Sequence, residues 1–98
     1  MLLYEVTLQV DPALSGAVEE HMRREHIPGI FASGCFHRIR WDRASPARFR
    51  TSYEARAVSD LERYLRDYAP GFRADFQERF PTGVAVTRET WTPLESWG

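Results

Sequence analysis

The sequence predicts a ferredoxin-like α+β sandwich with the element order βαββαβ, and two patterns carry this prediction. Apolar and polar side chains alternate in several short segments, which is typical of half-buried strands. Between these segments, apolar residues recur at the spacing of an amphipathic helix. The 98 residues, 43% of them hydrophobic, suffice for a single domain over residues 1–98 and are too few for two.

The strands are placed by the alternation of side chains. In the first, Glu5, Thr7 and Gln9 are polar and the residues between them are apolar. In the second, Ile39 and Trp41 are expected to face the core. The expected strands cover residues 4–10, 35–42, 48–56 and 84–91.

The first helix is bounded by proline-containing pairs. Asp11 and Pro12 favour its start, because aspartate accepts from free N–H groups and proline fits the first turn. Pro28 and Gly29 predict that it ends near His26.

A second helical segment joins the third and fourth strands. Ser59 and Glu62 form a capping box at its start, and Pro70 allows a further helix to begin at a bend. The apolar stripe of this segment includes Leu65 and Phe76. The residues expected to be almost fully buried are Val6, Leu8, Leu65 and Phe76.

Both helical segments are expected to cover one face of a four-stranded antiparallel sheet, with the first strand between the third and the fourth. The other face is left bare and polar. Exposed cross-strand ion pairs account for such a face, and the alternative is that two faces meet and close a dimeric α/β barrel. Leu3, Trp91, Leu94 and Trp97 lie at its edges, and large apolar residues there favour a homodimer through the open sheet face. The bare face carries Glu5, Thr7, Gln9, Arg38, Arg40, Arg50, Ser52, Glu54, Thr87 and Glu89.

Composition and charge exclude several classes of protein. The net charge is −1, and all 13 basic residues are arginine, which argues against a general nucleic-acid binder. No apolar run approaches the roughly 18 residues of a membrane span, and no basic segment precedes an apolar leader. A cytoplasmic protein without membrane contact is therefore expected. The single cysteine, Cys35, excludes a disulfide framework and a four-cysteine zinc site.

Arginines on the hairpin between the second and third strands form the candidate ligand site. Arg38, Arg40 and Arg50 share the bare face with Glu5 and Glu54. Free arginines at this density would bind a small anion such as a carboxylate or phosphate. If the glutamates pair with the arginines, the array is structural, and this is the outcome that we expect.

Two pairs of residues, each containing one histidine, have both a chemical and a structural interpretation. His21 and Glu25 would form a proton-transfer site if buried, but we expect the last turns of the helix to leave both partly exposed. Cys35 and His37 would share a strand face, and two ligands do not make a zinc site. A core-facing pair is the expected interpretation, and no metal or cofactor is predicted.

Several segments resemble a small bacterial family. They are Leu3-Tyr4-Glu5-Val6-Thr7, His26-Ile27-Pro28, Ser33-Gly34-Cys35-Phe36, and Leu61-Glu62-Arg63-Tyr64-Leu65 with Ala69-Pro70, Arg73 and Arg79-Phe80. The chain is similar to domain-of-unknown-function family 4286, which is related to dimeric α/β-barrel proteins. The resemblance implies the fold and the dimer and no activity. It also gives His26 a ligand-contacting role, beside its alternative role as a cap at the helix C-terminus.

The sequence favours a homodimeric domain that binds a small ligand or a partner without catalysis, since no residue set has catalytic spacing. The alternative is a cofactor-free enzyme of the oxygenase or isomerase kind that uses the barrel interior, by analogy of fold alone. A pocket with a histidine or tyrosine beside an arginine would favour the enzyme, and an interior of paired charges would favour the binding module. The predicted ligand residues are Glu5, His26, Arg38, Arg40, Arg50 and Glu54.

Overall fold

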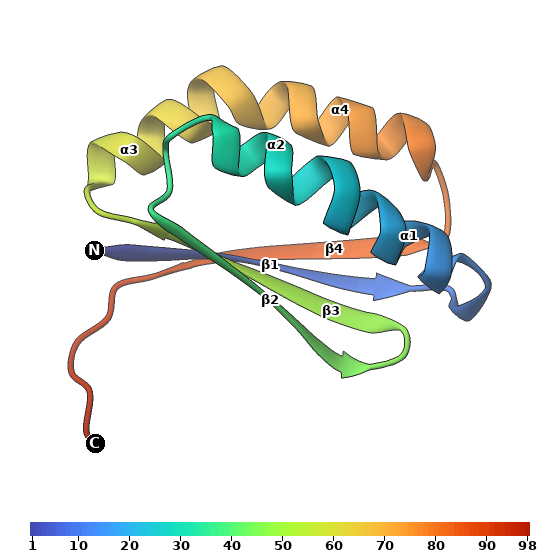
Figure 1. The fold of residues 1–98 in the computed structure, drawn as a ribbon, viewed down its shortest axis with the longest axis horizontal. Coiled ribbons are helices and arrows are strands. Elements are labelled where there is room, and N and C mark those ends of the chain that lie inside the picture. The colour runs from blue at the N-terminus through green and yellow to red at the C-terminus, as the bar shows by residue number, and fades with distance from the viewer.

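A four-stranded antiparallel sheet forms one layer of the molecule and two helical segments form the other, in this computed structural model of all 98 residues (Figure 1). The strands are β1 (Leu2–Val10), β2 (Arg38–Ser45), β3 (Arg48–Ala55) and β4 (Val84–Trp91), in the order β2-β3-β1-β4. This arrangement confirms the ferredoxin-like fold and the place of the first strand between the third and the fourth. Figure 1 shows the sheet face opposite the helices left bare.

Each helical segment contains a π-turn in its middle. The first consists of the 3-10 turn η1 (Pro12–Leu14), α1 (Ser15–His21), the π-turn η2 (Met22–His26) and α2 (Ile27–Ala32). The second consists of α3 (Val58–Arg63), the π-turn η3 (Tyr64–Tyr68) and α4 (Ala69–Arg79). None of these helices has the length and apolar character that crossing a bilayer requires.

The prediction that the first helix ends near His26 is wrong, because a π-turn accommodates the proline. The N–H of Ile27 donates to the carbonyl of Met22, five residues back. Pro28 then lies in the first turn of α2, where a missing N–H costs no hydrogen bond. The helix continues to Ala32. The N–H of Ala69 likewise bonds the carbonyl of Tyr64, so the expected bend before Pro70 is a second π-turn.

The start and the buried face of the second helical segment also differ from expectation. α3 begins at Val58 after an N-cap at Ala57 with no side-chain bond, so Ser59 does not cap it. Leu65 is 38% exposed, because η3 shifts the buried stripe from Tyr64 to Ala69 and leaves Leu65 outside it. Of the other predicted core residues, Leu8 and Phe76 are buried and Val6 is half-buried.

The second strand begins three residues later than predicted, at Arg38, and extends to Ser45. Cys35 is buried in the loop before it, whereas His37 is exposed, so the two do not form a core-facing pair. Ile39 and Trp41 pack from the helix side against the core, as expected. The core has two parts between the sheet and the helices, one rich in tyrosine around Tyr53 and one around Phe49, and Val6 packs against both.

Candidate functional site

Five of the six predicted ligand residues lie together on the bare face of the sheet. We call Glu5, Arg38, Arg40, Arg50 and Glu54, with Asp42, the bare-face array. The register places Arg38 opposite Glu54 on neighbouring strands, and Arg38 Nε lies 3.4 Å from Glu54 Oε2. Arg50 Nε lies 3.9 Å from Glu5 Oε2. Each glutamate therefore pairs with an arginine.

Asp42 joins the remaining arginines of the array. Its Oδ2 accepts a hydrogen bond of 3.0 Å from Arg50 and lies 3.4 Å from Arg40 Nε. The hydrogen bond from Arg50 holds the pKa of Asp42 below its ordinary value. Arg38, Arg40 and Arg50 thus all have acidic partners, and the array presents no unpaired cation.

His26, the sixth predicted residue, lies on the other side of the sheet. It is the last residue of η2, and its ring packs against Phe72 and Phe76 with centroids 5.7 Å and 5.6 Å away. It caps no helix terminus, because the helix continues through α2. Burial lowers the pKa of His26 to about 4, assisted by the charges of His21 and Arg88 and opposed by Asp75. The ring is therefore neutral at pH 7.

His26 lines a cavity of about 40 Å³ between the helices and the sheet. Three tyrosines contribute to its wall: Tyr4 of β1, Tyr53 of β3 and Tyr64 of η3. Burial raises the pKa of both Tyr53 and Tyr64, so their hydroxyls remain protonated and can donate hydrogen bonds. We call this space, lined by Tyr4, Tyr53, Tyr64, His26, Arg73 and Arg88 among others, the tyrosine cavity.

The two π-turns place cavity residues. Met22 and His26 are the first and last residues of η2, Tyr64 is the first of η3, and all three line the cavity. π-turns inside α-helices are frequent at functional sites, because the wider turn changes which side chains face inward. Sequence reasoning with a regular helical period misses this change of phase.

Two arginines of the cavity have no acidic partner. Arg73 of α4 donates from a terminal nitrogen to the hydroxyl of Tyr4 at 2.9 Å. Neither Arg73 nor Arg88 of β4 forms an ion pair, and both are exposed residues that line the cavity. The sequence contained one sign of this site: Arg88 follows Val84 and Val86 on the inward-facing parity of the fourth strand, where an apolar residue is expected.

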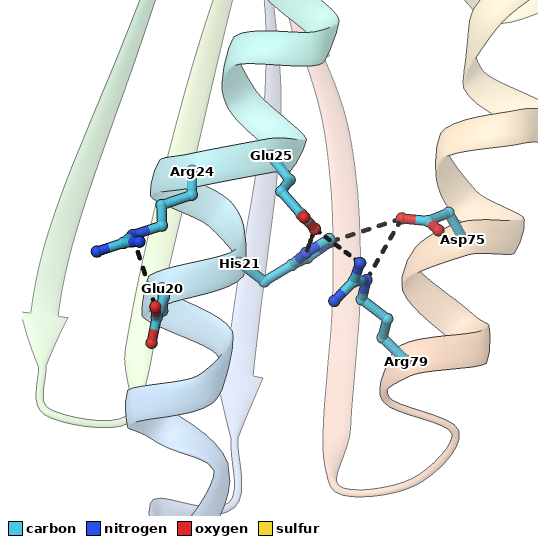
Figure 2. A network of polar contacts seen from close by, with 6 residues as sticks. All are labelled: Glu20, His21, Arg24, Glu25, Asp75 and Arg79. Carbon is cyan, nitrogen blue, oxygen red and sulfur yellow. Dashed lines mark hydrogen bonds and ion pairs between the residues drawn. The ribbon is translucent and has the colours of Figure 1, made fainter.

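A polar network joins the first helical segment to α4 (Figure 2). His21 is buried at 5% exposure, so the expectation that it is partly exposed is wrong, whereas Glu25 is exposed as predicted. His21 Nδ1 lies 2.9 Å from Glu25 Oε2, and its Nε2 lies 3.7 Å from Asp75 Oδ2. Arg79 contacts the same oxygens at 2.8 Å and 3.9 Å. No group of three or more histidine, cysteine or acidic side chains is arranged to hold a metal ion.

Comparison with known proteins identifies a family and a fold. The family described as "Domain of unknown function (DUF4286)" matches residues 1–94. The solved structure of Rv0793 from Mycobacterium tuberculosis superposes with a TM-score of 0.66 at 14% identity, over all of both chains. A putative antibiotic biosynthesis monooxygenase from Deinococcus radiodurans superposes with a TM-score of 0.64 at 13% identity, over 100% of this chain and 97% of the other. At these identities the likeness shows the fold alone. No curated protein matches the sequence.

Proposed function

Because the chain belongs to the family described as "Domain of unknown function (DUF4286)", we propose its function from the site itself: it is a homodimer that binds a small organic anion at the tyrosine cavity. One observation carries this proposal. Arg73 and Arg88, which have no acidic partners, flank a cavity whose wall includes three tyrosines and a neutral histidine.

The chemistry of the cavity suits an anion. A guanidinium donates charge-assisted hydrogen bonds to a carboxylate or an enolate, and protonated phenols add neutral donors. Two like charges close together repel one another, and a bound anion relieves that repulsion. The bare-face array offers no such gain, because its arginines already have acidic partners.

The size of the cavity limits what enters it. At about 40 Å³ it is much smaller than the roughly 300–1,000 Å³ of a typical ligand pocket. We therefore expect an anionic group of a few atoms to occupy the cavity, and the rest of the ligand to lie outside it, beside the exposed side chains of Arg73 and Arg88. The half-buried Phe72 lines the same space, and its movement would admit a larger ligand.

The dimer is supported by apolar side chains beside the bare face. Leu94 is 92% exposed and Trp97 is 85% exposed, in a segment that runs away from the helices after β4 (Figure 1). Large exposed apolar residues favour a partner, and a second copy would cover both them and the bare face. Light scattering at micromolar concentration should give about twice the chain mass of 11.4 kDa. A monomer that persists at high concentration would contradict the dimer. The anion site is tested separately, by the binding experiment below.

Binding is tested with benzoate as the probe and benzamide as its uncharged analogue. By mass action, benzoate should raise the melting temperature as its concentration increases, and benzamide should not. Arg88→Gln should abolish the benzoate effect, and the matched control Arg50→Gln, on the bare-face array, should preserve it. Equal stabilisation by benzamide, or loss of the effect in Arg50→Gln alone, would reject the tyrosine cavity as the anion site.

A second candidate function is favoured by the placement of His26. A neutral imidazole beside tyrosine and arginine donors combines a general base with groups that stabilise developing negative charge. A pocket with a histidine or tyrosine beside an arginine favours a cofactor-free oxygenase or isomerase over a binding module, and one fold neighbour is described as a putative antibiotic biosynthesis monooxygenase. The test is exchange of the acidic C–H protons of acetylacetone in deuterated water. Catalysis by the wild type that is lost in His26→Gln would favour the enzyme, and exchange at the buffer rate would favour simple binding.

A further inference from the structure

We propose that His21 and His26 form a two-histidine path that carries a proton between the tyrosine cavity and the surface carboxylates of Glu25 and Asp75. The inference rests on the proposed function, because a ligand in the cavity is what would gain or lose the proton. It assigns a role to His21, which lies outside the cavity wall.

The two rings lie next to each other in an apolar surrounding. Their centroids are 5.8 Å apart. The ring of His21 packs against Phe76 and Phe80, and that of His26 against Phe72 and Phe76. These phenyl rings make the surroundings of both imidazoles apolar, so the imidazoles are the groups that can carry a proton from the cavity toward Glu25.

Each imidazole has one buried nitrogen without a hydrogen-bond partner: Nε2 of His21 and Nδ1 of His26. Buried polar atoms almost always have a partner, so two such atoms on adjacent histidines require an explanation. A proton-transfer role supplies one, because a relay needs a nitrogen that is free to accept. No hydrogen bond joins the two rings, so transfer proceeds through rotation of a ring or through one bridging water.

The outer end of the path is visible in Figure 2. His21 extends from the first helical segment toward α4, with Glu25 at its Nδ1 and Asp75 near its Nε2, at 2.9 Å and 3.7 Å. Both carboxylates are about half exposed, and Arg79 contacts both. A proton that reaches His21 therefore has a direct exit to solvent.

The step moves one proton and changes only N–H and O–H bonds. A ligand proton passes to His26, and His26 passes a proton to Nε2 of His21. His21 releases the proton on Nδ1 to Glu25, which exchanges it with solvent. Rotation of the rings or exchange with water then restores the starting tautomers of both histidines. That of His21 has Nδ1–H donating to Glu25 and Nε2 free to accept.

The charges around His26 keep the proton from remaining there. Burial is the largest cause of its lowered pKa of about 4, and His21 and Arg88 lower the pKa further, whereas Asp75 raises it. His21 is faced by Glu25 from its own helical segment and by Asp75 and Arg79 from α4. Two carboxylates thus lie beside the outer histidine, and burial is the main cause that disfavours a proton on the inner one, which together favour movement of a proton outward.

Histidine ring ¹⁵N NMR on the ligand-free protein tests the pair. The ¹⁵N shifts should show that Nδ1 of His21 carries a hydrogen, because this nitrogen lies 2.9 Å from Glu25 Oε2. In His21→Gln the titration midpoint of His26 should rise by about half a pH unit or more, because a positive neighbour is removed. Glu25→Gln should shift the resonances of both rings. The matched control Glu20→Gln should shift neither, since Glu20 pairs with Arg24 and not with a histidine (Figure 2).

Solvent exchange of the His26 ring N–H separates a relay from a structural contact. In His21→Gln we expect this exchange at pH 7 to slow by about tenfold, because the path to Glu25 is cut. A purely structural His21 predicts the opposite result, since a packing defect admits water and speeds exchange. Unchanged or faster exchange, in a variant whose backbone spectrum shows that it is folded, would overturn the proposal. The experiment uses no ligand, so its failure is distinguishable from a failure of benzoate to bind.

Discussion

The arginines that we compare on the two faces of the sheet differ in whether they have acidic partners. On the bare face, Arg38, Arg40 and Arg50 each lie within 4.0 Å of a carboxylate oxygen. On the helix-covered side, Arg73 and Arg88 line one cavity and form no ion pair. A cluster of arginines in the sequence therefore does not identify an anion site. The absence of acidic partners in the folded chain is the more informative property.

Strand register explains the difference. The Cα partner of Arg38 is Glu54, and that of Arg50 is Asp42, so the register brings opposite charges together on the bare face. Arg88 pairs with Val6 across the sheet and finds no acid there. The arginines of the bare-face array are thus paired with acids on their own face, whereas Arg88 has no acidic partner on the other face.

The largest expected effect is a difference in stability loss between substitutions of two neighbouring residues of β3, whose side chains point to opposite faces of the sheet. Phe49 is 1% exposed beneath the helices, and Arg50 belongs to the bare-face array. Phe49→Ala should lower the free energy of unfolding by about 3–5 kcal/mol. Arg50→Ala should cost under about 1 kcal/mol, because exposed ion pairs contribute little. Urea denaturation measures both, and a loss in Arg50→Ala as large as that in Phe49→Ala would contradict this division between the faces.

The next effect is a dependence of stability on pH that belongs to the helix-covered side. The folded pKa of His26 is about 4, against an ordinary value of 6.5, so the unfolded chain binds more protons between these values. The full stability is present above about pH 6.5 and falls by up to about 3 kcal/mol as the pH is lowered to 4. His26→Phe should remove this fall.

The stability contributed by the bare face depends on pH over a different range, so the contributions of the two faces can be measured separately. The pKa of Asp42 lies below its ordinary value of 3.8, so the stability that it contributes is lost only as the pH falls below about 4. Asp42→Asn is therefore the matched control and should leave the change between pH 6.5 and 4 intact. Urea denaturation at pH 7, 5.5 and 4 measures this. A His26→Phe variant with the same slope as the wild type would show that the pKa of His26 is not lowered in the folded chain.

The fold was predictable because its strands depend on local alternation. Side-chain parity in β1 and β3 places Glu5 and Arg50 on one face, and the structure agrees. The π-turns were not predictable in the same way. Pro28-Gly29 ordinarily ends a helix, and whether the chain inserts a π-turn instead depends on packing against a second helix that is distant in sequence.

The candidate site was less predictable than the fold for the same reason. Tyr64 and Ala69 both face the core because the wider turn of η3, which begins at Tyr64, spaces them five residues apart. A regular helical period would place Leu65 on the buried face, but Leu65 is exposed. The site also combines Tyr4 with Arg73, which are 69 residues apart. No spacing pattern encodes such a contact. The charged residue at an inward position of β4, Arg88, was the one local sign of it.

A smaller effect should follow from removal of the Tyr4 hydroxyl. This oxygen accepts a hydrogen bond from Arg73 at 2.9 Å in a partly buried setting. Tyr4→Phe should therefore lower the free energy of unfolding by about 1–2 kcal/mol. The matched control Tyr68→Phe removes the hydroxyl of a half-buried tyrosine, for which the structure shows no hydrogen bond, and should cost less. Equal losses in the two variants would mean that the bond from Arg73 contributes nothing.

The smallest expected effect is a change in the free energy of unfolding that has opposite signs for two arginine substitutions. Arg50→Gln removes a partner from Glu5 and should lower the free energy of unfolding by a few tenths of a kcal/mol. Arg88→Gln removes a cation that has no acidic partner and that lowers the pKa of His26, so it should leave stability unchanged or raise it by a few tenths of a kcal/mol. Both effects should shrink at high salt, because these side chains are exposed and screened. Denaturation at low and high ionic strength, without any ligand, measures the two signs. A clear loss of stability in Arg88→Gln would mean that Arg88 has a structural partner. Arg88 would then not be an unpaired cation available to bind an anion at the cavity.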